Sequence, residues 1–168
     1  LLRSRQHRSR GRSGEAAVPG PLRMMSINVT SLGAEPVAGG RIKTGWEILV
    51  DLPWDLVAIQ EARLSPVVLA NLCQAEQWSC VTSLPGEDGK VLCAMISKCG
   101  HLTQSFQGER CHEALWSNVG HTIRVANLYG PSNGTEVDLL TTGAIARASL
   151  IRAEAGGGGP SAIVGDYN

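Results

Sequence analysis

Residues 55–63, DLVAIQEAR, decide the fold. Four of the first six residues are apolar, which predicts a short buried strand. The polar pair Gln60 and Glu61 follows that strand directly. The end of a strand is where rigid backbone meets solvent, so an amide and a carboxylate there are both held in place and accessible.

The same arrangement recurs at three other apolar runs. MMSI ends at Asn28, TIRVANL ends at Tyr129, and AIV leads into Gly165, Asp166, Tyr167 and Asn168. Taken singly, each tip has an ordinary interpretation, because Gly-Asp-x-Asn is a common turn and Gln-Glu is a common solvated strand end. Their shared position at strand ends, in one order along the chain, is the informative feature.

Between these strands the sequence predicts helices and further strands. Apolar residues of residues 41–52 fall on one side of a helix, Ser65 and Pro66 have the residue types of a helix start, and residues 135–155 follow a cap at Ser132 or Thr135. Strands are expected at residues 22–28, 55–60, 78–84, 91–98, 121–130 and 161–168, with two shorter ones in residues 105–118 that meet near Gly108. Helices separated by runs of strands indicate a layered α/β sandwich with a mixed sheet.

Charge is distributed unevenly along the chain. Residues 1–23 hold six Arg against Glu15, whereas the rest holds nine Lys and Arg against fourteen Asp and Glu. Residues 1–21 have too little apolar content to offset their ordering entropy, which predicts a disordered basic arm. A solvated tail, a nucleic-acid-contacting arm, a nuclear address and a transit peptide are all compatible with this composition.

Composition also bounds the class of protein. No apolar run approaches the ~20 residues that span a bilayer, and no apolar segment follows the charged N-terminus as in a secretory signal. The five Cys are odd in number and lack C-x-x-C spacing, which argues against a disulfide framework and a zinc site. We expect an intracellular protein, nuclear or cytoplasmic, with no membrane association. The chain starts at Leu1 and stops at the tip of a predicted strand, so we expect a fragment of a longer protein.

Phosphoester hydrolysis is the chemistry that suits these strand tips. Glu61 fits a ligand of Mg²⁺, with Mn²⁺ as an alternative, because a hard cation takes oxygen ligands and neutralises phosphate charge. Asp166 fits a group that orients or deprotonates the attacking water, and Tyr129 a donor to a phosphate oxygen. Asn28 and Asn168 add dipoles without the repulsion that further carboxylates would bring.

Four segments carry a resemblance to a known family. Residues 26–32 (SINVTSL), 55–63 (DLVAIQEAR), 124–133 (RVANLYGPSN) and 164–168 (VGDYN) resemble four successive motifs of the endonuclease/exonuclease/phosphatase superfamily. The resemblance covers residues 24–168. It implies a four-layer α/β/β/α sandwich with mixed sheets, truncated at its C-terminal side, in which residues 22–168 form the N-terminal part of the domain.

The resemblance also implies roles for single residues. Glu61 and Asn28 correspond to metal-site residues, and Asp166, Asn168 and Tyr129 to catalytic ones. The family often has Asn directly after Tyr-x-Pro, where this chain has Ser132 followed by Asn133. Substrate binding is predicted for three residues: Arg63, Ser132 and Asn133.

The implied function is metal-dependent phosphodiester hydrolysis on nucleic acid, with DNA favoured over RNA. Within the superfamily, the chain most resembles the abasic-site-type endonuclease domain of a non-LTR retrotransposon. The Gln-Glu-x-Arg run of residues 60–63 and the open C-terminus fit a long parent chain, and the basic arm would suit a polyanion. The family's later Asp and its terminal Asp-His pair would follow residue 168, so the isolated chain is expected to be inactive. The four His lie in no matching motif and are expected to be surface or satisfied structural residues: His7, His101, His112 and His121. Two alternatives stay open: a lipid or inositol phosphate phosphoesterase of the same fold, and a truncated or decayed non-enzymatic homologue.

Overall fold

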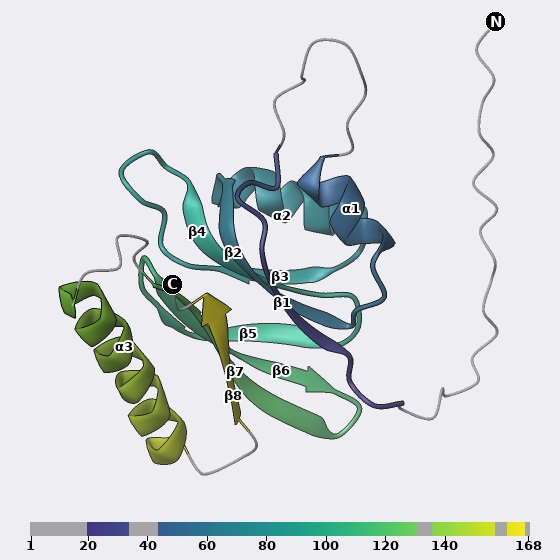
Figure 1. Cartoon of the computed structure of the whole chain (residues 1–168). Helices are drawn as coiled ribbons and strands as arrows, with labels where there is room; N and C mark the ends of the chain where they lie inside the picture. The colour runs from purple at the N-terminus through teal and green to yellow at the C-terminus, as the bar shows by residue number, and fades with distance from the viewer. Residues whose placement is uncertain (1–19, 34–43, 131–135, 157–160, 167–168) are drawn as a thin grey trace, which may run out of the picture.

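Two four-stranded sheets pack face to face, with helices on both outer sides (Figure 1). The structure is a computed structural model and describes residues 20–33, 44–130, 136–156 and 161–166. Helices α1 and α2 cover one sheet and α3 lies against the other, so the layers run α/β/β/α. The predicted four-layer sandwich is confirmed.

The first sheet has the strand order β1-β2-β4-β3. Its strands are β1 (Met24–Asn28), β2 (Leu56–Leu64), β3 (Ser79–Thr82) and β4 (Val91–Ser97). β1 runs parallel to β2, whereas β4 is antiparallel to both of its neighbours, so the sheet is mixed as predicted. The parallel pair needs a crossover, which α1 (Gly45–Asp51) supplies, and α2 (Pro66–Ala75) links β2 to β3.

The second sheet is also mixed and has the strand order β5-β6-β7-β8. Its strands are β5 (His101–Gln107), β6 (Cys111–Asn118), β7 (His121–Tyr129) and β8 (Ser161–Asp166). β7 and β8 are parallel, and α3 (Glu136–Ala155) connects them. Each sheet therefore places one parallel, helix-linked pair of strands at its edge.

Strand β2 is buried on both faces because it lies between two cores. Val57 and Ile59 pack with Leu49, Leu69 and other residues under α1 and α2. The alternate residues of β2 belong to the core between the sheets, which contains Leu56, Ala58, Met95, Leu102, Ala114, Trp116 and Val125. This double burial explains the uninterrupted apolar run in the sequence.

Local capping residues fix the starts of α1 and α2. Thr44 and Glu47 form a capping box, in which Glu47 N donates to Thr44 Oγ1 over 3.2 Å and Thr44 N donates to Glu47 Oε2 over 2.9 Å. Ser65 caps α2 by accepting from Val68 N over 3.3 Å, and Pro66 follows it, which confirms that predicted start. The predicted caps of α3, Ser132 and Thr135, lie outside the described residues.

Two predicted boundaries were wrong. β2 continues past Gln60 to Leu64, because a bulge lets the strand rejoin β4 at Val91. β5 begins at His101 rather than at residue 105. Leu102 is the apolar residue in His101–Gln104 that becomes buried, so this part of an edge strand lacks a strong sequence signal.

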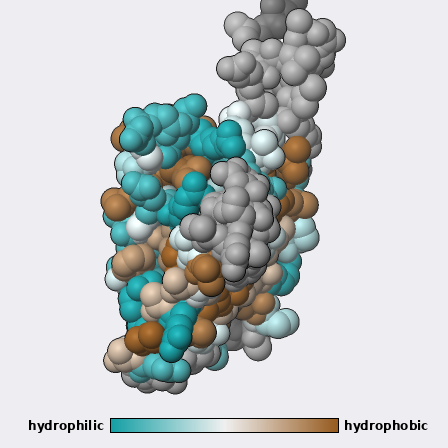
Figure 2. Space-filling model, turned by 60° about the vertical axis from the view of Figure 1, so that its left-hand side comes forward, coloured by the Kyte–Doolittle hydropathy of each residue, from teal (hydrophilic) through white to brown (hydrophobic). Residues whose placement is uncertain are grey.

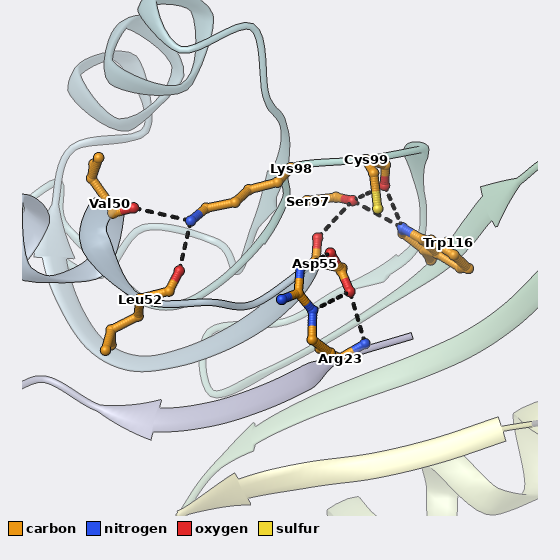
Figure 3. Close-up of polar contacts among 8 residues, drawn as sticks. All are labelled: Arg23, Val50, Leu52, Asp55, Ser97, Lys98, Cys99 and Trp116. Atoms are coloured by element: carbon orange, nitrogen blue, oxygen red, sulfur yellow. Dashed lines mark hydrogen bonds and ion pairs between the residues drawn. The ribbon is translucent and has the colours of Figure 1, made fainter. Parts of the chain in front are cut away.

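Hydrogen bonds connect the residues that precede β1 and β2 (Figure 3). Arg23 donates through its backbone N and its guanidinium to Asp55, with Nη2 lying 2.8 Å from Oδ1. The Arg23 side chain holds the pKa of Asp55 below its usual range. Lys98, just after β4, donates from Nζ to the carbonyls of Val50 (3.0 Å) and Leu52 (2.8 Å) at the end of α1.

The five cysteines are free thiols, and Cys73, Cys93 and Cys111 are buried. In Figure 2, hydrophobic and hydrophilic side chains are interspersed over the face that carries α3. Exposed apolar side chains of α3 include Leu140 and Ile151. Within the described ranges, no helix combines the length and the apolarity needed to cross a bilayer.

Candidate active site

The register of the two parallel strand pairs, one in each sheet, brings the predicted tips to the same end of the sandwich. Asn28 is opposite Gln60 at the end of the β1–β2 pairing, and Tyr129 is opposite Asp166 at the end of β7–β8. Parallel strands end at the same edge, which is where ligands bind in open α/β sheets. Asn28 Nδ2 connects the two sheets by donating to Asp166 Oδ2 over 2.6 Å.

A bulge in β2 aims Glu61 at this edge. The pairing with β4 is interrupted between Gln60 and Leu64. Within that interruption Glu61 has φ 55° and Arg63 has φ 50°, a left-handed conformation that non-glycine residues seldom adopt. Bulges redirect side chains beside functional sites, and such strained residues concentrate there.

Both oxygens of the Glu61 carboxylate are engaged. Oε1 accepts from Asn28 Nδ2 and from the Tyr129 hydroxyl, each over 3.0 Å, and Oε2 accepts from Arg63 Nη2 over 2.6 Å. The bond from Asn28, with those from Tyr129 and Arg63, holds the pKa of Glu61 below its ordinary value, although burial opposes this. Glu61 is therefore a carboxylate at neutral pH.

Tyr129 is poised as a neutral hydrogen-bond donor. Its side chain is buried, and burial raises the pKa of its hydroxyl, with the Glu61 carboxylate acting in the same direction. A raised pKa keeps the proton on the hydroxyl, so Tyr129 can donate it to an oxygen atom in the site.

Asn28 faces the two carboxylates with its amide nitrogen. Its Oδ1 accepts from Thr30 N over 3.0 Å, whereas Nδ2 donates to both Glu61 and Asp166. In this arrangement Asn28 positions the carboxylates. The prediction that it ligates a metal through its oxygen stays a prediction.

Asp166 is held by the backbone of the neighbouring strand. Its carbonyl accepts from Gly130 N over 2.7 Å. At Gly165, a Cβ atom would overlap the carbonyl oxygen of Leu128, so this position accepts glycine alone without displacing β7. This steric limit explains why glycine precedes Asp166 in the sequence motif.

Arg110 is a site residue that the sequence did not reveal. It lies immediately before β6, and its carbonyl accepts from Tyr129 N over 2.8 Å. Its guanidinium carbon is 5.6 Å from the centroid of the Tyr129 ring. The pairing of Cys111 with Leu128 sets this placement, and a strand register between distant segments cannot be derived from the local sequence.

A buried network of polar side chains lies next to the bulge of β2. Gln60 Nε2 donates to Asn127 Oδ1 over 2.7 Å, and Asn127 Nδ2 donates to the carbonyls of Ile59 (3.0 Å) and Ala94 (2.9 Å). His112 Nε2 lies 3.2 Å from the same amide nitrogen. Asn127 therefore connects β7 to β2 and β4 directly under the site.

His112 departs in part from its expected role. It is fully buried, and burial lowers its pKa to about 3. Its Nδ1 has no hydrogen-bond partner among the described residues, so this structural histidine is only half satisfied. His101 and His121 are exposed, as expected for surface residues, and His7 lies outside the described residues.

The oxygen donors of the site fit a hard divalent cation. Carboxylate oxygens of Glu61 and Asp166 converge on one amide nitrogen, 3.0 and 2.6 Å away. Mg²⁺ commonly takes one or two carboxylates and completes its shell with water and substrate oxygens. In the part of the chain that the structure describes, no group of three or more His, Cys, Asp or Glu gathers as a closed metal cage. Ser132, Asn133 and Asn168 lie outside the described residues.

No family model and no curated protein sequence matches this chain. Solved structures do match. The endonuclease domain of TRAS1, a telomere-specific non-LTR retrotransposon, superimposes with a TM-score of 0.56 at 15% identity, covering 87% of this chain and 58% of that domain. Sphingomyelinase C from Streptomyces griseocarneus gives 0.57 at 14% identity, covering 88% of this chain and 64% of its own.

A humanized TDP2 from D. rerio gives a TM-score of 0.57 at 16% identity, covering 88% of this chain and 62% of its own. The chain thus spans about three fifths of the length of these structures. At such identities the likeness is one of fold. The chain has the fold of the endonuclease/exonuclease/phosphatase superfamily.

Proposed function

We propose that this chain carries the site of a metal-dependent phosphodiesterase that acts on nucleic acid. The observation that supports this most is the meeting of four side chains from the two sheets at one end of the sandwich: Asn28, Glu61, Tyr129 and Asp166. Two carboxylates and two neutral donors around one point match the needs of a phosphate and one hard cation.

Each residue has a proposed part. Glu61, with Asn28 beside it, holds Mg²⁺ or Mn²⁺, and a bound cation would neutralise charge on the phosphate oxygens. Asp166 accepts a proton from the attacking water or orients it through a carboxylate oxygen. Tyr129, whose hydroxyl donates to Glu61 in this structure, redirects that hydrogen bond to a phosphate oxygen when substrate binds. The proposed parts of Asn168 (catalysis) and of Ser132 and Asn133 (substrate binding) rest on the sequence motifs.

Nucleic acid is the favoured substrate because two arginines lie at the site. Arg63 lies beside Glu61, and Arg110 stacks over Tyr129 without a carboxylate partner among the described residues. The arginines of residues 1–21 would add contacts to a polyanion, each releasing counterions. DNA over RNA, a retrotransposon origin and the inactivity of the isolated chain are further parts of the proposal.

A phosphoesterase for lipid headgroups is the second candidate, since sphingomyelinase C shares the fold. The test uses the full natural protein that contains residues 1–168, with supercoiled plasmid, abasic oligonucleotide and sphingomyelin vesicles offered in parallel under Mg²⁺ titration. We expect chelator-sensitive cleavage of the nucleic acids and none of the lipid.

Glu61→Gln is the decisive variant, because a neutral amide is a far weaker ligand for a hard cation. We expect it to lose cleavage while the fold persists. Glu87→Gln, at an exposed turn between β3 and β4, is the matched control. Parental cleavage by Glu61→Gln would remove Glu61 from the site, and cleavage of sphingomyelin alone would favour the lipid candidate.

A further inference from the structure

The three donors to the Glu61 carboxylate are not equally fixed. Asn28 is tied to the backbone, since its Oδ1 accepts from Thr30 N. Tyr129 is 6% exposed and its backbone N donates to the carbonyl of Arg110. Both donors to Oε1 are therefore held by the body of the protein.

Arg63 is held differently. Its side chain is 52% exposed, against 14% for Glu61, and Glu61 is its only partner among the described residues. An exposed ion pair contributes little to stability, so this contact can be exchanged at small cost. Oε2 is thus the carboxylate oxygen whose partner can leave.

We propose that Arg63 occupies Glu61 Oε2 as a stand-in cation, competes there with a divalent metal ion and, once displaced, holds the anionic substrate. This inference rests on the proposed function. Its physical basis is that a guanidinium and a divalent ion repel each other strongly at a few ångströms, so the two cannot share Oε2.

Geometry keeps the displaced side chain close to the reaction. Arg63 lies two residues after Glu61 on the same bulge, and both residues adopt the left-handed conformation there. A guanidinium freed at this position can bind a phosphodiester in bidentate fashion. Metal and substrate would then bind cooperatively, because the first releases the group that the second needs.

The test measures binding without turnover on the full natural protein. Calorimetry with Mn²⁺ compares the parent with Arg63→Gln, Arg63→Lys and Arg147→Gln, the last being an exposed arginine of α3. We expect Arg63→Gln to bind Mn²⁺ about twofold to fivefold more tightly, the range expected for loss of a competing exposed ion pair. Arg63→Lys should stay near the parent because it keeps the charge.

A second titration uses a phosphorothioate oligodeoxynucleotide that resists cleavage. In the parent, Mn²⁺ should strengthen its binding, and in Arg63→Gln most of that gain should disappear. Unchanged or weaker Mn²⁺ binding by Arg63→Gln, or no Mn²⁺ binding by the parent, overturns the inference. If the binding titrations show that Mn²⁺ displaces Arg63 but no hydrolysis is found, the proposed function alone is refuted. If hydrolysis is found but the titrations show no displacement, this inference alone is refuted.

Discussion

The side-chain nitrogen of Asn28 lies 2.6 Å from Oδ2 of Asp166, although 138 residues separate them. Asn28 ends the first strand of one sheet and Asp166 ends the last strand of the other. The same nitrogen also reaches Glu61 Oε1, so one amide holds two carboxylates that would otherwise repel each other.

Asn28→Ala should raise the pKa of Glu61 toward its ordinary value, because the bond from Asn28 contributes most to lowering it. A lowered carboxyl pKa gives stability at neutral pH that is lost as pH falls through the folded-state value. The variant should therefore have less of this stability at neutral pH, and what remains should be lost at a higher pH than in the parent. NMR titration of the Glu61 carboxyl carbon measures the shift. Ser31→Ala, in the adjoining loop, should leave it unchanged, and an unaltered Glu61 pKa in Asn28→Ala would contradict the prediction.

His112 should make the fold sensitive to acid. Its folded-state pKa of about 3 lies below the ordinary 6.5, so the unfolded chain binds the extra proton between these values. Stability should therefore be complete above about 6.5 and fall steadily toward 3. Urea unfolding across this range should show a shallower pH dependence for His112→Gln than for the parent. Exposed His121→Gln serves as the control, and equal slopes for His112→Gln and the parent would refute the assignment.

We expect the ion pair between Glu113 and Arg152 to be the strongest contact that holds α3 against the second sheet. Glu113 on β6 is 1% exposed, and Arg152 Nε donates to its Oε1 over 2.7 Å. Arg152→Ala leaves a buried carboxylate with Arg124 alone nearby, at 3.9 Å, and should cost about 3 kcal/mol.

Denaturant unfolding measures that cost, with Arg147→Ala on the exposed side of α3 as control. The double variant Glu113→Gln/Arg152→Met should recover much of the loss, because no unpaired charge stays buried. A double variant as unstable as Arg152→Ala would show that the charge is not the cause.

Gly165→Ala should destabilise the fold and displace Asp166. The added Cβ meets the Leu128 carbonyl, so β8 must shift against β7, at a cost of about 1–3 kcal/mol. Gly143→Ala is a matched control inside α3, where a Cβ meets nothing within 4 Å. That control should instead stabilise by roughly 0.5–1 kcal/mol, as for a glycine in a helix interior. Thermal unfolding compares the pair, and equal effects would refute the steric argument.

The sequence was sufficient to predict the sandwich and four strand tips. Asn28, Glu61, Tyr129 and Asp166 follow apolar runs, and the ends of such runs are a local property. The structure brings these four side chains together by hydrogen bonds. Their chemical roles stay predictions.

Other features depend on pairings between distant segments. The bulge that turns Glu61 and Arg63 into left-handed conformations depends on how β2 rejoins β4. Arg110 reaches Tyr129 because Cys111 pairs with Leu128, and Asn127 is buried because two sheets close over it. Neither Arg110 nor Asn127 has a local pattern that separates it from an ordinary loop or strand residue.

The span between Asn28 and Asp166 also has a kinetic consequence. Each parallel strand pair can form within its own part of the chain. The contact between Asn28 and Asp166, in contrast, closes a loop of almost the whole chain, and the loss of conformational entropy on closing so long a loop delays the contact. We expect the site to assemble after both sheets are ordered. Pulse-labelling hydrogen exchange should then protect β2 and β7 before the amide of Thr30 is protected. The amide of Thr30, which donates to Asn28 Oδ1, thus reports when the two sheets have joined at the candidate site.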